Sequence, residues 1–310
     1  MATAAGEQPL LTLAALAAPA AGITLQPGDN DARHTWGGKV RSAISGQAVH
    51  ELQQALLAIG AMSAKPDGDF GNETTDAVRR LQWYFNTIPV RLRMAAGSEE
   101  VHGSLQVFAA PAAIVVDGFV RPTTLNELLA WQQGGFVLTS PLVRQSTTTL
   151  SNIELAPTFT VLTYPAAGAN EFLVHQGFVA TVARLNAQAN AASVGLRINQ
   201  SFRVQGLPPT GAVVSPASNS QHLIGHALDL NIVDGSTVNT SAMFIAGSQS
   251  QGAKDFIKGV KQDGIRWGGD FSPKDPPHFD DFVLPSSEDY AFSFYFAQRS
   301  FSAQHPLRTA

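Results

Sequence analysis

Three side chains that can bind a metal ion lie in two segments far apart in the sequence, and only folding can bring them to one site. His222 and Asp229 lie in SQHLIGHALD at 220–229, and His278 follows 49 residues after Asp229, in DPPHFD at 275–280. Three protein ligands leave one position of a tetrahedral zinc ion open, which is typical of a catalytic rather than a structural site. The chain has no cysteine, so it lacks the thiolates that most structural zinc sites use.

The residues around these ligands predict a rigid arrangement. Apolar residues alternate in ALDLNIV at 227–233, and this period of two indicates a buried strand with Asp229 on the face opposite the leucines. Two prolines between Asp275 and His278 stiffen the backbone and favour an extended conformation at Asp275. We therefore expect Asp229 on a strand, and Asp275 and His278 in one fixed arrangement.

These segments resemble the zinc-binding pattern of the M15 peptidases, the D-alanyl-D-alanine carboxypeptidases and L-alanyl-D-glutamate endopeptidases that cut peptides of bacterial peptidoglycan. The shared pattern is S-x-H-x-x-G-x-A-x-D at 220–229 followed by D-x-x-H at 275–278. SFR at 201–203 is similar to the family segment whose arginine faces the substrate, and RWGGDF at 266–271 resembles the Trp-Gly-Gly stretch of the endopeptidase branch. The resemblance covers roughly residues 150–300 and implies an α+β domain, with a small antiparallel sheet and zinc at its groove.

The resemblance assigns a role to each matching position. It implies that His222, Asp229 and His278 hold Zn²⁺, that Asp275 is the general base, and that Arg203 stabilises developing negative charge or binds a substrate carboxylate. The chemistry of the side chains agrees with these roles. A carboxylate can take the proton of a zinc-activated water, and a guanidinium can bind a carboxylate through two parallel hydrogen bonds.

The same resemblance places two residues at the substrate groove. They are Ser220, at the start of the first motif, and Trp267, in the Trp-Gly-Gly stretch. The residue types alone leave other interpretations open. Trp267 also fits the packing of a core, and Arg203 also fits an ion pair without a part in catalysis.

Two further polar residues lie near the motifs. His226 is four residues after His222 and in principle competes as a ligand, but the family pattern leaves its position free. We therefore expect His226 to be structural or to support a ligand. Asp280 follows His278 and is expected either to be solvated or to orient the imidazole through a hydrogen bond.

Upstream, three segments predict a small helical domain. VHELQQALLAIG at 49–60 has leucines at helical spacing and a glycine stop, and PDGDFGNETTDAVRRLQWYF at 66–85 joins an Asp-Gly turn to a second apolar helix. VDGFVRPTTLNELLAW at 116–131 repeats the turn and helix. The region 46–133 resembles the three-helix peptidoglycan-binding domain. That resemblance implies peptidoglycan as its partner.

The upstream region departs from that family in one place. Residues at about 86–114 form an insertion relative to the family pattern. We expect this insertion to fold as a hairpin that reshapes or covers the glycan-binding surface. A helical spacer that binds nothing is the alternative. The loop at 67–72 precedes a helix that Asn72 or Thr74 is expected to cap. It lacks the glycine and distal glutamate of an EF-hand, so we exclude calcium there.

Length and composition agree with two domains. The chain has 310 residues, and a domain takes about 150. The expected order is an N-terminal extension at 1–45, the helical domain at 46–133, a linker at 134–160 and the peptidase domain at 161–300. The peptidase domain is expected to open with a helix at 170–190.

Charge argues against two classes of partner. Charged residues make up 14% of the chain and its net charge is −4, with no cluster of Lys and Arg. We therefore expect neither nucleic acid nor an anionic membrane as partner. The apolar run at 9–25 follows Glu7 rather than a basic segment and is too short for a membrane span. We expect no Sec signal.

These observations predict a zinc peptidase that is made in the cytoplasm and acts at a cell wall, most simply as an L-alanyl-D-glutamate endopeptidase. Two delivery routes fit, a phage-type endolysin or an antibacterial effector injected by secretion machinery, with an immunity protein as a further partner. D-alanyl-D-alanine carboxypeptidase or cross-bridge endopeptidase activity is the alternative within the enzymes. A wall-binding protein without catalysis is the alternative outside them.

Overall fold

The chain folds into two compact units in a computed structural model, Met1–Thr139 and Ser140–Ala310. The fold is of the α+β class, with a helical first unit and a sheet-based second unit. The structure describes residues 10–17, 22–41, 45–88, 90–93, 105–107, 114–159, 170–207, 217–299 and 308–309. Within these residues, no helix is long and apolar enough to cross a membrane.

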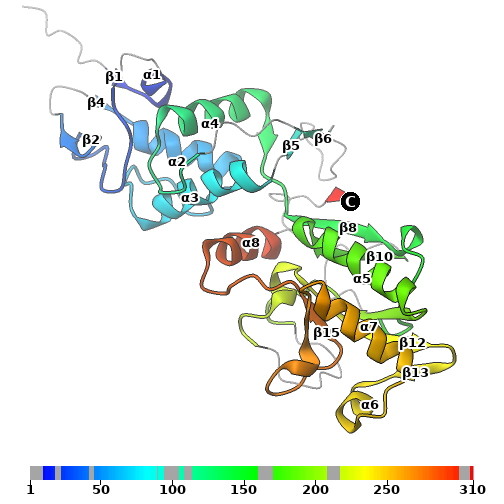
Figure 1. The fold of residues 1–310 in the computed structure, drawn as a ribbon. Helices are drawn as coiled ribbons and strands as arrows, with labels where there is room; N and C mark the ends of the chain where they lie inside the picture. Colours follow the sequence, from blue (N-terminus) through cyan, green and yellow to red (C-terminus); the bar gives the residue numbers. More distant parts are fainter. Residues whose placement is uncertain are drawn as a thin grey trace, which may run out of the picture. The chain divides into compact units, whose positions relative to one another are not determined.

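The three longer helices among the described residues of the first unit follow the apolar spacing of the sequence (Figure 1). They are α2 (Ala48–Ala58), α3 (Asn72–Thr87) and α4 (Pro122–Gly134). Their inward faces bury the predicted apolar residues, including Leu52, Leu56, Ala77, Val78, Leu81 and Phe85, and α4 also buries Leu128. Neither expected side-chain cap of α3 is present, because the N-cap is Gly71 and Asn72 is already helical.

The segment before α2 is built into this unit. The Val120 N–H donates to the Leu25 carbonyl, and the Phe70 N–H donates to the Asp29 carbonyl. Trp36 is fully buried. The short elements here are β1 (Leu10–Leu11), α1 (Leu13–Leu16), β2 (Thr35–Trp36), β3 (Lys39–Val40) and β4 (Ser45–Gly46).

The region of the expected insertion contributes two strands. β5 (Val90–Arg93) pairs antiparallel with β6 (Leu105–Val107) and with β7 (Phe136–Val137). This is the pairing of a hairpin, although residues 94–104 between the two strands lie outside the described part.

A mixed sheet forms the centre of the second unit. Its strand order is β14 (Arg266–Trp267), β15 (His278–Asp280), β12 (Ala227–Asp234), β11 (Gly195–Gln200) and β9 (Ile153–Leu155), with β13 (Thr237–Asn239) also pairing with β12. The pairings are antiparallel, as expected of a small sheet, except for the parallel pair β11–β9. The alternating residues of β12 bury Leu228, Leu230 and Ile232 on one face.

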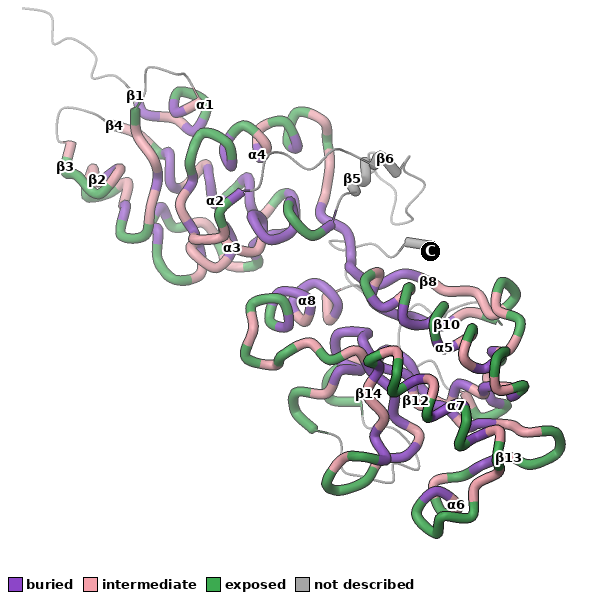
Figure 2. Tube along the Cα trace, viewed as in Figure 1, coloured by how far each residue is buried: buried purple, intermediate pink, exposed green. Residues whose placement is uncertain are grey.

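Helices and a second small sheet complete this unit. α5 (Val179–Ala191) and α7 (Gln251–Gln262) contact each other and pack on β11 and β12. Buried segments of α5, β10 and β12 mark the core in Figure 2. The remaining elements are β8 (Leu142–Ser146), β10 (Glu171–His175), β16 (Arg308–Thr309), α6 (Ser241–Ala246), α8 (Glu288–Gln298) and the 3-10 turns η1 (Thr147–Thr149), η2 (Gln176–Phe178), η3 (Gln221–Ile224) and η4 (Gly268–Asp270).

Two expectations about this part of the chain differ from the structure. The expected linker at 134–160 holds β8 and β9, which pair within the second unit. The expected helix at 170–190 begins at Val179, because residues 171–175 form β10 antiparallel to β8. A short continuous apolar run such as FLV in β10 has the same appearance in a buried strand and in a buried helix.

Candidate metal centre

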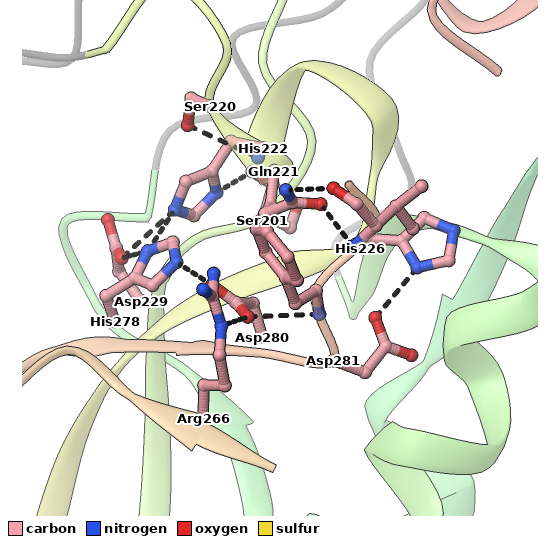
Figure 3. Close-up of polar contacts among 12 residues, drawn as sticks. Ser201, Ser220, Gln221, His222, His226, Asp229, Arg266, His278, Asp280 and Asp281 are labelled. Atoms are coloured by element: carbon pink, nitrogen blue, oxygen red, sulfur yellow. Dashed lines mark hydrogen bonds and ion pairs between the residues drawn. The ribbon is translucent and has the colours of Figure 1, made fainter. Parts of the chain in front are cut away.

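Antiparallel pairing brings the two sequence motifs together. In the ladder between β12 and β15, Asp229 lies directly opposite His278. His222 lies in η3, just before β12. As Figure 3 shows, the His222 Nε2 atom lies 3.1 Å from Asp229 Oδ1 and 3.2 Å from His278 Nδ1, and His278 Nδ1 lies 3.4 Å from Asp229 Oδ1. The three predicted ligands therefore converge on one point.

A single glycine allows the turn from η3 into β12. Gly225 has a φ of +77°, a conformation that costs little only for glycine. A Cβ atom at Gly225 would lie 2.6 Å from the backbone nitrogen of His175 in the adjacent β10. The glycine of the motif thus fixes the short path between His222 and Asp229.

Hydrogen bonds select the tautomer of both imidazoles. His222 Nδ1 lies 2.7 Å from the Ser201 carbonyl oxygen, and His278 Nε2 lies 2.8 Å from a carboxylate oxygen of Asp280. The carbonyl and the carboxylate can only accept a hydrogen bond, so His222 Nδ1 and His278 Nε2 carry the protons and donate. In the neutral imidazoles of these tautomers, His222 Nε2 and His278 Nδ1, the two atoms near Asp229, carry the lone pairs. Two neutral imidazoles and one carboxylate form a donor set that suits Zn²⁺ and other divalent transition metals.

Electrostatics tie the cluster together. Burial raises the pKa of the Asp229 carboxyl, but His222 and His278 outweigh this effect and hold that pKa well below its usual value. Burial lowers the pKa of His278, whereas the carboxylates of Asp229 and Asp280 raise it, to about 9 overall. A bound cation replaces protons in such a set of ligands.

Asp275 lies in a tight turn that packs against the Trp-Gly-Gly stretch. Its backbone N–H donates to the Gly268 carbonyl at 2.8 Å, and its own carbonyl accepts from the His278 N–H at 3.0 Å. A Cβ atom at Gly268 would lie 2.1 Å from the Asp275 carbonyl oxygen, so glycine is required for this contact. Burial and repulsion from Asp229 raise the pKa of the Asp275 carboxyl, while His278 and His222 oppose this increase.

Arg203 is buried on another side of the same cluster. Only 5% of the residue is exposed, and its backbone N–H donates to the His222 carbonyl at 3.0 Å. Its guanidinium donates to the Gln200 side chain at 3.3 Å. Burial lowers the pKa of Arg203, while the attraction of Asp229 opposes this effect. The buried Arg203 guanidinium therefore interacts electrostatically with the Asp229 carboxylate.

The contacts of the two expected groove residues lie within the protein. The Ser220 hydroxyl accepts from the His222 N–H at 3.4 Å, and the Ser220 carbonyl accepts from the Tyr290 hydroxyl at 3.1 Å. The Trp267 indole N–H donates to the Pro276 carbonyl at 2.8 Å. Ser220 thus caps η3, and Trp267 braces the turn that carries Asp275.

His226 lies away from the convergent ligand atoms. Its Nδ1 lies 2.8 Å from Asp281 (Figure 3). The centres of the His226 and His175 rings are 4.3 Å apart. Asp281 also accepts from the Thr181 hydroxyl at 3.0 Å. These contacts give His226 a structural place at the end of the strand pair β12–β15.

The sequence interpretation missed two residues of the surroundings. Arg266 forms an ion pair with the fully buried Asp280. Burial raises the pKa of the Tyr290 hydroxyl, and the positive charge of Arg203 opposes this increase. A strand pairing between RW and HFD would have placed Arg266 opposite Asp280. No signal in the sequence connects Tyr290 to this site.

Comparison with known families matches both units in part. Residues 214–281 match the model of the M15 peptidase family described as D-alanyl-D-alanine carboxypeptidase. Residues 45–89 match the model of a peptidoglycan binding domain. No curated protein matches the chain. The first match includes the three convergent residues, and the second spans α2 and α3.

Proposed function

Because the chain carries an M15 metallopeptidase domain behind an N-terminal peptidoglycan-binding domain, we propose that it hydrolyses peptide bonds of bacterial peptidoglycan with Zn²⁺. One observation carries the proposal. His222, Asp229 and His278 present two imidazole lone pairs and a carboxylate oxygen within 4.8 Å of one another. No thiolate is available in the chain, and three ligands leave room for a substrate or a water molecule.

The residues around the ligands supply the other groups that peptide hydrolysis needs. Zinc held by the three ligands would act as a Lewis acid and lower the pKa of water. Asp275 accepts the proton of the attacking water and returns it to the leaving amine when the carbon–nitrogen bond breaks. Burial raises the pKa of this carboxyl, which makes it a stronger base. Arg203 stabilises the negative charge that develops on the carbonyl oxygen, or binds a carboxylate of the substrate.

We favour the bond between L-alanine and D-glutamate as the one cleaved. The support is the Trp-Gly-Gly stretch at 267–269 and the use of aspartate rather than glutamate at Asp275. In this proposal Trp267 forms a wall of the substrate groove, and Ser220 contacts the substrate at its edge. D-alanyl-D-alanine carboxypeptidase activity is the second candidate, and the description of the matching family favours it. Cleavage of cross-bridges is a third.

The test is to incubate the purified, zinc-loaded protein with isolated peptidoglycan and to identify new peptide ends by mass spectrometry. New L-alanine carboxyl ends and D-glutamate amino ends are expected. Release of single D-alanine would move the assignment to the carboxypeptidase. Sedimentation of the protein with the wall without any new ends, at a confirmed zinc content, would instead support a wall-binding protein without catalysis.

The proposal includes a place of action outside the cytoplasm, as an endolysin or as an injected antibacterial effector. Peptidoglycan lies outside the inner membrane, so the enzyme reaches it only after release or delivery. Expression in a bacterium with and without an added export signal tests this point. Lysis is expected only with the signal, and lysis without any added signal would show that the chain reaches the wall unaided.

A further inference from the structure

An ion pair between Arg266 and Asp280 lies next to His278. It links His278 to Arg266, a residue outside the three proposed metal ligands. Asp280 has no exposed surface, and one of its oxygens lies 2.8 Å from His278 Nε2. Arg266 binds both oxygens of this carboxylate, through Nε at 2.6 Å and a terminal nitrogen at 2.7 Å. The line from Arg266 through Asp280 to His278 is visible in Figure 3.

We propose that Arg266 is a positioning residue of the metal centre, which locks Asp280 so that Asp280 holds His278 with Nδ1 facing the metal. The inference deepens the proposed function and rests on it for the identity of the site. The register of the sheet supports it, because Arg266 lies directly opposite Asp280 in the pair β14–β15. Both partners are thus held by strands rather than by mobile loops.

The hydrogen-bonding capacity of Asp280 agrees with a locked carboxylate. One oxygen accepts from Arg266 and from the Phe282 N–H at 3.1 Å, and the other accepts from Arg266 and His278. A buried carboxylate with four such bonds has little freedom to rotate. Its position then fixes both the tautomer and the ring angle of His278.

Aromatic rings hold the guanidinium itself. The Arg266 guanidinium carbon lies 3.9 Å from the ring centre of Phe282 and 5.1 Å from that of Phe271. The Phe271 ring also packs 5.7 Å from the ring of His278. Phe282 has a φ of +43°, which is uncommon for a bulky residue. The strand end therefore adopts a costly conformation that places a ring over Arg266.

The other interpretation of Arg266 is direct binding of a substrate carboxylate, since 39% of its side chain is exposed. The two interpretations differ in what they predict for the protein without substrate. A positioning residue changes metal binding, whereas a residue that binds only substrate changes KM and leaves metal binding as it was.

The test measures zinc binding by the metal-free full-length chain in competition with a chelating dye. For Arg266→Gln, the zinc dissociation constant is expected to increase by about tenfold, the lower end of the range for groups that support metal ligands. Arg266→Lys keeps the charge but not the two parallel hydrogen bonds, so its zinc dissociation constant should lie between those of the parent and Arg266→Gln. Arg197→Gln is the matched control, because Arg197 pairs with Glu154 on the same sheet, and it should bind zinc like the parent.

Zinc binding by Arg266→Gln that is unchanged or tighter overturns the proposal, whatever happens to activity. If Arg266→Gln fails to fold, Arg266→Lys decides in the same way. The measurement needs no peptidoglycan, so a failure of the proposed cleavage and a failure of this inference are distinguishable. An increase in KM with parental zinc binding would assign Arg266 to the substrate instead.

Discussion

Asp275 differs from the three convergent residues in the kind of contact it makes. Its backbone forms hydrogen bonds with Gly268 and His278. Burial and repulsion from Asp229 raise the pKa of its carboxyl. A carboxyl so placed can exchange a proton without holding the metal. This distinction separates the proposed base from the proposed ligands.

We expect Asp275→Asn to keep zinc and to lose hydrolysis. The amide has nearly the same shape but cannot accept a proton, so kcat/KM should fall by about 10²–10⁴. The zinc dissociation constant should stay within about twofold of the parent, because asparagine leaves the assigned ligands untouched. Chelator competition and peptide release from isolated wall measure the two quantities.

Asp270→Asn is the control for this change. Asp270 precedes the same turn, is 51% exposed and pairs with Lys261 at the surface, so its amide variant should retain both properties. Loss of zinc together with activity in Asp275→Asn would place Asp275 among the ligands and would contradict the assigned base.

The three residues of the metal-binding motif could be predicted from the sequence, whereas the role of Arg266 could not. His222, Asp229 and His278 are recognisable from their chemistry together with the family pattern that they match, without any knowledge of the sheet. The role of Arg266 depends on which residue lies opposite it in β15. Sequence periodicity predicts strands but does not give their register, and a shift of one residue would turn Arg266 to the other face.

Two glutamines anchor equivalent loops in the first unit and give the repeated Asp-Gly motif a physical reason. Gln53 in α2 accepts from the Asp67 and Gly68 N–H groups at 2.9 and 2.8 Å and donates to the Asp69 carbonyl. Gln82 in α3 is bonded in the same way to the second loop, accepting from the N–H groups of Asp117 and Gly118 and donating to the carbonyl of Phe119. Each helix thus holds the loop that leads into the next one.

Gln53→Ala is expected to lower the free energy of unfolding of the first unit by about 2–3 kcal/mol, because it leaves buried loop groups without partners. Urea unfolding followed by fluorescence measures the change. Gln54→Ala is the matched control, since Gln54 is exposed next to it on the same helix. Equal stability of the two variants would show that the loop holds its shape without the amide.

The elements of the second unit were predicted unevenly for a related reason. β12 follows a clear alternating pattern and was found. β10 was assigned to a helix because the partner that makes it a strand, β8, lies in a stretch rich in Ser and Thr that suggests a linker. Pairing between distant segments overrides local preference in such short runs.

At the scale of the whole molecule, each unit has its own core. Trp36, Phe70, Tyr84 and Trp131 are buried in the first unit, and the second has a separate cluster around the sheet. Independent cores predict that each half folds alone, with a division at 139/140 rather than at the end of a long linker. Binding and cleavage should then be separable.

We expect residues 140–310 alone to cleave soluble peptidoglycan fragments with the kcat/KM of the full chain, but to digest insoluble wall at least about tenfold more slowly. Attachment through a second module raises the local concentration of bonds only on an immobile polymer. Residues 1–139 alone should sediment with the wall and release nothing. Equal digestion of insoluble wall by the full chain and by 140–310 would mean that the first unit is a spacer, and failure of 1–139 to sediment would lead to the same conclusion.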